Sequence, residues 1–292
     1  MSFSLTTPRV VATRADLKAA RADLSGTVAL VMTMGALHEG HLSLVRRAHE
    51  LADHVVVSIF VNPTQFAPGE DFDRYPRTLD ADLAALGTVG ADLVFTPQPD
   101  EVYLTPAQFT LDPGPIAQDL EGQTRPTHLA GVALVVTKVM NLVRPDFALF
   151  GQKDAQQLAM VRLLVKDTDL PVQIVSVPIS RDTDGVARSS RNAYLSPDER
   201  SHAQALSRAL QVGATAVRSG SPLTQAVADV ETTLQAEPGV QVDYVAARSV
   251  NDWALVDDRT PAGTQVYLLV AAYVGSTRLI DNTVVTIPEV TR

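Results

Sequence analysis

The chain has 292 residues, of which 46% are hydrophobic and 20% charged, a composition typical of one large or two modest globular domains. Its formal charge of -9 argues against an extended nucleic-acid surface, and its lack of cysteine excludes disulfides and thiolate chemistry. The sequence shows neither a start of signal-peptide type nor an apolar run of membrane-spanning length. We therefore expect a soluble, cytoplasmic protein with no nucleic-acid or membrane partner.

Short apolar strands alternate with helical segments through the first two thirds of the chain. The run at 54–61 is almost wholly apolar, which is typical of a strand covered on both faces of its sheet. Repeated strand–helix units predict an α/β fold with a doubly wound parallel sheet, because right-handed crossovers put helices on both faces. The expected strands are 28–31, 54–61, 92–96, 147–150 and 172–177, and the expected helices are 41–52, 80–86, 131–142 and 155–167.

The pattern changes after about Pro178, where a polar loop at 180–192 follows the last strand of this series. Two helical stretches then precede three strands, an order that indicates a smaller α+β domain. We therefore expect a first domain over residues 1–179 and a second over residues 180–292. The expected elements of the second domain are helices at 197–218 and 222–235 and strands at 240–247, 265–272 and 276–281.

The segment MTMGALHEGHL, residues 32–42, joins a predicted strand to a predicted helix through a turn that contains glycine. A helix start at the mouth of a parallel sheet attracts phosphate, because its backbone N–H groups and its dipole favour an anion. His38 and His41 lie three residues apart, so both can reach the same anion from one side of the first helical turn. The segment therefore predicts a nucleotide site.

Three other interpretations compete for this segment. The spacing of Gly35 and Gly40 imitates a P-loop, but His41 and Leu42 stand where that motif needs lysine and a hydroxyl residue. A zinc site of metalloprotease type needs a histidine four residues after His38, and the chain offers no cysteine and no evident third ligand. The third interpretation is that the histidines only cap and solvate the start of the helix.

Two further segments follow predicted strands, at the edge of the sheet where ligands bind in doubly wound folds. Asn62 and Gln65 offer neutral donors and acceptors for a hydroxyl- and carboxylate-bearing substrate, unless the loop bonds only its own backbone. Lys153 can neutralise phosphate charge, and Asp154 can bind ribose or cap the next helix. Gln157 lies one helical turn beyond Lys153 and faces a similar direction.

Two polar loops complete the set of candidate segments. Ser189, Ser190 and Arg191 combine two hydroxyls with a guanidinium, which suits triphosphate oxygens, and a loop in this place can close over a ligand. The alternative is a solvated linker. Arg125 and His128 put a carboxylate-binding guanidinium and an imidazole ahead of a helix.

Together these motifs resemble the pantothenate synthetase (pantoate–β-alanine ligase) family of the HIGH-motif nucleotidyltransferase superfamily. The resemblance runs in order through TMGALHEGH, FVNPTQF, DRYPRTLDADL, RPTHLAGV, GQKDAQQL and SSRNAYLS, and it covers most of the chain. It implies a Rossmann-like first domain that binds ATP and pantoate, a C-terminal lid domain and a homodimer. It also implies an ATP-dependent ligase of pantothenate and coenzyme A biosynthesis, which joins pantoate to β-alanine through a pantoyl adenylate and releases AMP and pyrophosphate.

The resemblance also assigns roles to individual positions. His38 and His41 correspond to the HIGH histidines near the ATP phosphates, and with Lys153 they are the expected catalytic residues. Arg125 and His128 match positions near the intermediate, where β-alanine arrives. The expected ATP-binding residues are Met34, His38, Gly40, His41, Lys153, Asp154, Ser189, Ser190 and Arg191, and the expected pantoate-binding residues are Gln65 and Gln157, with Asn62 in support.

The chain departs from the family pattern at three positions. Met32 replaces a proline, Gln152 a glutamate and Arg188 an apolar residue, and none of these changes removes a proposed phosphate or pantoate contact. Arg188 adds a cation beside the serine loop. Magnesium should accompany ATP, bound mainly through phosphate oxygens and water, and no protein metal ligand is assigned. No dedicated carboxylate cage is evident, and Asp82 and Glu121 are only weak candidates for magnesium ligands.

Three other activities remain open. A nucleotidyltransferase that acts on a phosphate-bearing substrate would form a dinucleotide, although the neutral Gln65 and Gln157 disfavour a doubly charged substrate. An aminoacyl-tRNA synthetase would need a basic RNA-binding domain, which the charge of -9 disfavours. A catalytically silent nucleotide sensor would bind ATP without forming AMP.

Overall fold

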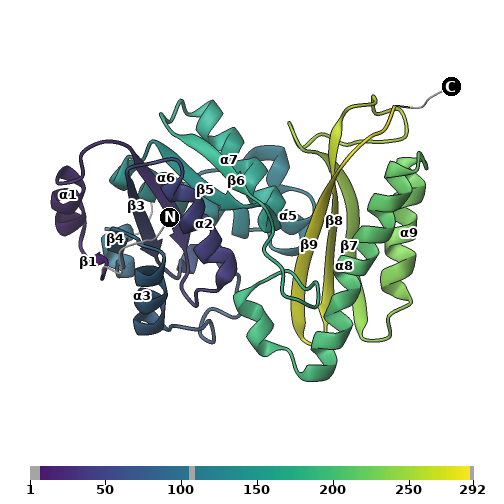
Figure 1. Ribbon diagram of the computed structural model, residues 1–292, viewed down its shortest axis with the longest axis horizontal. Coiled ribbons are helices and arrows are strands. Elements are labelled where there is room, and N and C mark those ends of the chain that lie inside the picture. Colours follow the sequence, from purple (N-terminus) through teal and green to yellow (C-terminus); the bar gives the residue numbers. More distant parts are fainter. Residues whose placement is uncertain (1–6, 105–108, 290–292) are drawn as a thin grey trace. The chain divides into compact units, whose positions relative to one another are not determined.

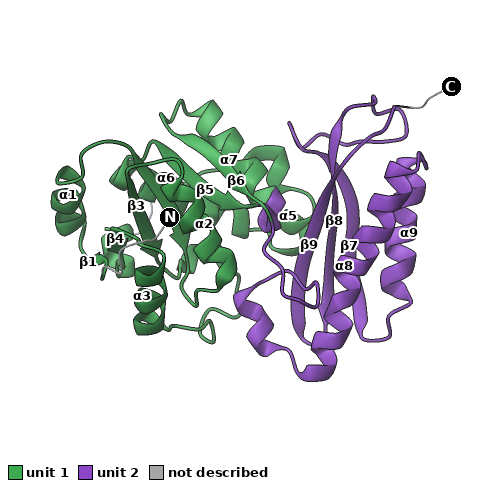
Figure 2. Cartoon of the chain, viewed as in Figure 1, with its two compact units in different colours: residues 1–151, 156–178 green, residues 152–155, 179–292 purple. Residues whose placement is uncertain are grey.

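The computed structural model describes residues 7–104 and 109–289, and the chain divides into two compact units (Figure 2). The first unit comprises Met1–Gly151 and Gln156–Pro178, and the second comprises Gln152–Ala155 and Ile179–Arg292. A short segment around Lys153 therefore belongs with the second unit although it lies between two elements of the first. Over the described residues, no helix combines the length and the apolar character that a membrane crossing requires.

The first unit is built on a six-stranded parallel sheet in the order β1-β4-β3-β2-β5-β6, which confirms the predicted doubly wound fold (Figure 1). The strand order reverses between β2 and β5, and ligands of such sheets bind at the carboxyl ends of the strands that flank this point. The strands are β1 (Arg9–Val11), β2 (Val28–Thr33), β3 (His54–Ile59), β4 (Leu93–Phe95), β5 (Phe147–Gly151) and β6 (Gln173–Val177).

Helices cover both faces of this sheet. Ala29 and Val31 of β2 pack with Leu44 of α2, whereas the buried Val28 and Leu30 face the other side, because side chains alternate along a strand. On that side α6 contacts β2 and α1. The helices along this part of the chain are α1 (Arg14–Ala22), α2 (Glu39–His49), α3 (Leu79–Thr88), α4 (Pro99–Val102), α5 (Glu121–Thr124), α6 (His128–Val143) and α7 (Ala155–Asp167), with 3-10 turns η1 (Pro63–Gln65), η2 (Gly114–Ala117) and η3 (Gln152–Asp154).

The second unit carries a three-stranded antiparallel sheet in the order β7-β8-β9, packed against two long helices. The longer helix begins where the sequence predicts, because Ser196 and Glu199 form a capping box around Pro197. Leu206 and Leu210 of this helix pack with the sheet, so the unit has its own apolar core. Its elements are η4 (Ser190–Tyr194), α8 (Pro197–Arg218), α9 (Leu223–Gln235), β7 (Val240–Ser249), β8 (Gln265–Val274) and β9 (Thr277–Thr286).

Candidate active site

A buried carboxylate holds the turn that joins β2 to α2. The oxygens of Asp82 accept hydrogen bonds from the backbone N–H groups of Ala36 (3.0 Å) and Leu37 (2.8 Å) and from the hydroxyl of Thr78 (3.2 Å). Gly35 has φ +81°, and a Cβ there would lie 3.0 Å from Asp82, so the turn requires glycine. Asp82 was considered above as a weak magnesium ligand, but its oxygens hold this turn. The sequence analysis missed this role.

His38 and His41 lie together at the start of α2, with ring centroids 4.1 Å apart. The backbone N–H of His38 donates to Nδ1 of His41 (3.3 Å), and Nδ1 of His38 accepts from the backbone N–H of Gly40 (3.1 Å). The histidines therefore do cap the helix. Since Nδ1 is an acceptor in both rings, each neutral imidazole carries its proton on Nε2 and offers an Nε2–H donor. Capping therefore uses the Nδ1 nitrogen of both rings.

The loop after β3 is organised around a buried asparagine. Oδ1 of Asn62 accepts from the hydroxyl of Tyr103 (2.7 Å), and Nδ2 of Asn62 donates to the side-chain oxygen of Gln65 (3.2 Å) and to the backbone oxygen of Gly131 (3.2 Å). Nε2 of Gln65 lies 2.8 Å from the sulfur of Met34, which directly follows β2. Asn62 therefore orients Gln65 from within the protein. Tyr103, which supports Asn62, carried no recognisable signal in the sequence.

Arg125 and His128 both contact the backbone oxygen of Gln65, at 3.3 Å from the guanidinium and 3.0 Å from Nδ1 of the imidazole. Arg125 also makes a bidentate ion pair with Glu70, with both distances 2.8 Å. Burial acts to raise the pKa of Glu70, but the hydrogen bond and charge of Arg125 outweigh it, so the pKa lies below its ordinary value. Glu70 is therefore ionised at neutral pH, and a substrate carboxylate would have to compete with it for Arg125.

A close approach between α6 and η1 shapes the same loop. A Cβ added at Gly131 would lie 2.2 Å from the backbone oxygen of Thr64, so a Gly131→Ala variant must displace η1. We expect a loss of stability of roughly 1–3 kcal/mol from this overpacking. If Gln65 binds pantoate, as the family resemblance implies, the variant should have a higher KM for pantoate with little change in the KM for ATP, because the displaced turn η1 carries Gln65 and the α2 turn is a separate segment. Steady-state kinetics with each substrate varied in turn would show this, and equal changes in both KM values would contradict it.

Two consecutive glutamines at the start of α7 have different environments. Gln156 is buried, and its side chain bonds the backbone N–H of Glu121 (3.0 Å) and the backbone oxygens of Ile116 (2.6 Å) and Asp119 (3.0 Å). Gln157 is half-buried, and its side chain makes no hydrogen bond with any described residue. Successive helical positions point about 100° apart. Gln156 therefore ties loops together, which leaves Gln157 as the one suited to a ligand.

Other candidate residues belong to the second unit. Lys153 is half-buried on η3, with no hydrogen bond from its ammonium to the described residues, and Asp154 beside it is exposed. The hydroxyl of Ser189 accepts from the backbone N–H of Arg191 (3.3 Å) and begins η4. Arg188, an added cation in the sequence, forms an ion pair with Asp182 (2.8 Å). Its charge is therefore balanced locally.

Within each unit, the structure brings several predicted residues into contact. In the first unit, Met34, Asn62, Arg125 and His128 all touch Gln65, and His38 touches His41. Across residues 7–104 and 109–289, no group of three or more histidine, aspartate or glutamate side chains could hold a metal ion. The zinc interpretation of the two histidines therefore gains no support.

Comparison with known proteins gives one consistent result. The family model of pantoate–β-alanine ligases matches residues 7–284. Pantothenate synthetase of Acidothermus cellulolyticus is 50% identical over 276 residues (94% of this chain, 91% of that protein), and that of Thermobifida fusca is 50% identical over 289 residues (96% and 97%). The crystal structure of pantothenate synthetase from Thermus thermophilus superposes with a TM-score of 0.88 at 43% identity, covering 94% of this chain and 98% of that one.

A further solved structure carries ligands. Pantoate–β-alanine ligase from Francisella tularensis, complexed with β-γ ATP and β-alanine, is similar with a TM-score of 0.78 at 30% identity, covering 94% of this chain and 97% of that one.

Proposed function

We propose, for a chain that belongs to the pantoate–β-alanine ligase family, an ATP-dependent ligation that passes through a pantoyl adenylate. Pantoate's carboxylate attacks the α-phosphorus of ATP, and pyrophosphate leaves. The amine of β-alanine then attacks the carbonyl of this mixed anhydride, loses a proton and displaces AMP, which yields pantothenate. The contact between Gln65 and Met34 supports this proposal most directly. It puts the side chain proposed to bind pantoate beside the end of β2, and the chain continues from there to His38 and His41, which are proposed to bind the ATP phosphates.

The first step brings together two anions, so it needs charge neutralisation and alignment more than acid–base catalysis. We propose that the Nε2–H groups of His38 and His41, which form the HIGH signature, donate to phosphate oxygens where negative charge develops. Lys153 and Arg191 add positive charge for the same triphosphate. The remaining proposed ATP-binding residues are Met34, Gly40, Asp154, Ser189 and Ser190.

We propose that pantoate and β-alanine contact different kinds of side chain, neutral amides for pantoate and a guanidinium and an imidazole for β-alanine. Gln65 and Gln157 hold pantoate without a strong ion pair, so its carboxylate stays nucleophilic, and Asn62 acts by orienting Gln65. Arg125 and His128 serve the side where β-alanine arrives. Nδ1–H of His128 donates to the backbone oxygen of Gln65, so the neutral ring has its acceptor at Nε2, which suits the amine of β-alanine.

We propose that ATP reacts as its magnesium complex. The described residues contain no cluster of carboxylates suited to the ion, and Asp82 is engaged with backbone N–H groups. Phosphate oxygens and water are therefore the proposed ligands, which agrees with the preference of Mg²⁺ for keeping several waters. Removal of the metal with a chelator should abolish pyrophosphate release.

Family resemblance also supports a homodimeric, cytoplasmic enzyme whose second domain (180–292) acts as a lid over the substrates of the first (1–179). A lid that brings 189–192 over the nucleotide would keep water from the anhydride. Light scattering of the purified protein tests the dimer, and a monomer at micromolar concentration would contradict it.

One assay tests the proposed reaction. AMP and pyrophosphate are measured from ATP with pantoate and β-alanine both present, and then with each omitted. We expect AMP only when both are present, and pyrophosphate at one equivalent per active site with pantoate alone. AMP formation without pantoate, or a dinucleotide product with a phosphate-bearing substrate, would overturn the ligase assignment in favour of the alternatives considered above.

Replacement of Gln157 by alanine should mainly impair pantoate binding. Loss of one or two hydrogen bonds to the substrate should raise the KM for pantoate roughly tenfold, with the KM for ATP nearly unchanged. Gln173→Ala, at an exposed position of β6, is the matched control. An unchanged dependence on pantoate in Gln157→Ala would remove this residue from the site.

A further inference from the structure

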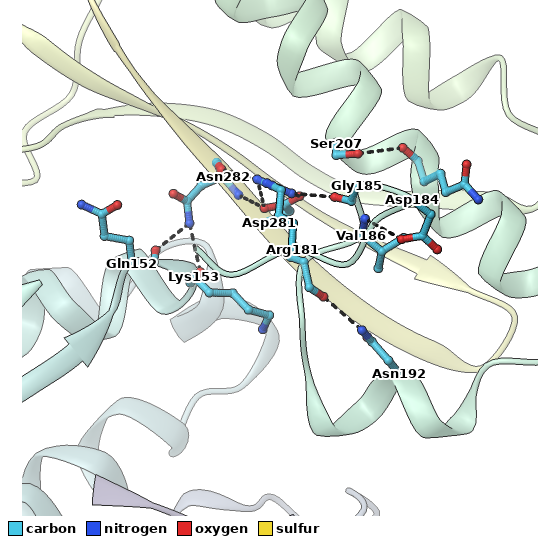
Figure 3. Close-up of polar contacts among 12 residues, drawn as sticks. Gln152, Lys153, Arg181, Asp184, Gly185, Val186, Asn192, Ser207, Asp281 and Asn282 are labelled. Carbon is cyan, nitrogen blue, oxygen red and sulfur yellow. Dashed lines mark hydrogen bonds and ion pairs between the residues drawn. The ribbon is translucent and has the colours of Figure 1, made fainter. Parts of the chain in front are cut away.

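Two adjacent residues of β9 reach two segments that are far apart in the sequence. Asp281 lies two residues after Leu279, so both side chains are on the same face of the strand, the one that packs in the core with the helices. Asn282 therefore lies on the opposite face. Both side chains are buried and both are polar, with exposed fractions of 3% and 2%. Buried polar groups of this kind need partners, and here the partners lie in the η3 turn and in the loop that precedes η4 (Figure 3).

Asn282 holds the backbone of the η3 turn. Its Nδ2 group donates to the backbone oxygens of Gln152 (2.8 Å) and Lys153 (3.0 Å), so one amide satisfies two consecutive carbonyls (Figure 3). The ammonium of Lys153 has no hydrogen bond with any described residue. The position of the lysine is therefore set by its backbone, and the backbone is held by Asn282.

Asp281 holds the other segment through Arg181. The guanidinium makes a bidentate ion pair with the carboxylate, at 2.6 and 2.9 Å, and also donates to the backbone oxygens of Gly185 (3.0 Å) and Asn282 (3.2 Å). Burial raises the pKa of Asp281, and the hydrogen bonds and charge of Arg181 act against that rise. The charge of Lys153 acts in the same direction as Arg181, so the lysine lies within electrostatic range of Asp281.

Arg181 belongs to a hairpin that leads directly into the serine loop. Arg181 pairs with Ala187 in an antiparallel bridge, and the backbone N–H of Arg188 donates to the backbone oxygen of Ser180 (2.9 Å). The side chain of Asn192 donates to the backbone oxygen of Ala187 (3.1 Å), which ties the start of η4 to the hairpin. The ion pair on β9 therefore holds the segment that carries Ser189 and Arg191.

We propose that Asn282 and the Asp281–Arg181 pair are positioning residues. From neighbouring positions on β9 they hold the Lys153 turn and the Ser189–Arg191 segment in fixed places, so that both segments contact the triphosphate of ATP. This inference rests on the proposed function of those two segments. The alternation of side chains along a strand explains how neighbouring residues serve two segments at once. Asn282 and Asp281 touch no substrate in this proposal and act only through the groups that they hold.

The first test uses Asn282→Ala and Arg181→Lys, each measured in single-turnover formation of pyrophosphate from ATP and pantoate. We expect each to lower the rate roughly 10- to 100-fold, the size expected for a catalytic cation displaced by about 1 Å, with the KM for pantoate unchanged. Arg181→Lys keeps a positive charge beside the buried Asp281 but loses the bidentate geometry and the fork that also reaches the backbone oxygens of Gly185 and Asn282, so it is the variant expected to stay folded. Asp243→Asn is the matched control, because it breaks an ion pair with Arg278 on the same sheet.

The second test distinguishes positioning from general destabilisation. If Asn282 acts through Lys153, Asn282→Ala should cause almost no further loss in a Lys153→Ala background, and Arg181→Lys should cause almost none in an Arg191→Ala background. Full additivity in both backgrounds, or an equal loss in Asp243→Asn, would overturn the proposal. If the wild-type protein forms AMP and pyrophosphate while these variants keep full activity, the inference fails and the proposed function stands. If the wild type forms neither product, the proposed function itself fails.

Discussion

Replacement of Lys153 by alanine is expected to slow adenylate formation about 10²–10³-fold, the size expected when one charge-stabilising group is removed. The ammonium has no hydrogen bond with the described residues, so its loss should leave the fold intact. The loss should fall on the chemical step, because the positive charge matters most when the pyrophosphate leaves with its added negative charge. Rapid-quench measurement of pyrophosphate release from ATP and pantoate would show it directly.

Lys166→Ala is the matched control for this variant. Lys166 lies in the last turn of α7 and is exposed, so its replacement removes the same charge and volume from the surface. The control should keep wild-type turnover and wild-type thermal unfolding, and Lys153→Ala should remain folded at the assay temperature. Near-normal turnover of Lys153→Ala would refute the role assigned to the lysine, and similar losses in both variants would point to net charge and not to position.

Replacement of His41 by alanine is expected to cause a loss of the same size, about 10²–10³-fold in adenylation. This variant also removes the acceptor for the backbone N–H of His38, so the cap of α2 is weakened at a cost of about 1 kcal/mol. Activity and stability should therefore fall together in His41→Ala. Thermal unfolding and single-turnover kinetics on the same sample measure both effects.

His41→Gln separates the two roles of the histidine. A glutamine at the third helical position can reach back to the N-cap backbone, as in a capping box, but it has no imidazole Nε2–H at the same reach. We expect His41→Gln to recover the stability lost in the alanine variant and to keep the loss in adenylation. If the glutamine variant regains both, the histidine acts as a helix cap and its proposed contact with phosphate is wrong.

Several elements of the fold could be predicted because local patterns decide them. The apolar run at 54–61 indicated a strand covered on both faces, and β3 is buried within the parallel sheet. Ser196, Pro197 and Glu199 marked the start of α8 through capping chemistry that depends only on neighbouring residues. The sequence analysis missed β1, because a strand of three residues has too little periodicity to be recognised. It also missed the nine-residue helix α1, although Thr13 caps its start.

The sequence also suggested candidate site residues, but it could not show which partners their side chains contact. The sequence indicated a carboxylate-binding role for Arg125, and the structure shows that Glu70 occupies its guanidinium from 55 positions away in the chain. Arg188 appeared as an extra cation, and Asp182 balances it. Such pairings depend on which loops the fold brings together, and no short-range pattern encodes them.

The sequence by itself determined the kinds of unit in this protein, and it marked the segments to which we assign the chemistry. Hydrophobic periodicity, helix-capping residues and glycine turns depend on residues that are close in the sequence, so they can be recognised without the structure. Only the tertiary structure decided that Gln152–Ala155 belongs with the second unit, that Asp82 holds the turn ahead of His38, and that Asn282 holds the backbone of Lys153. Each of these depends on a buried polar group that finds its partner across a long sequence separation, and burial of such groups is defined only once the chain is packed.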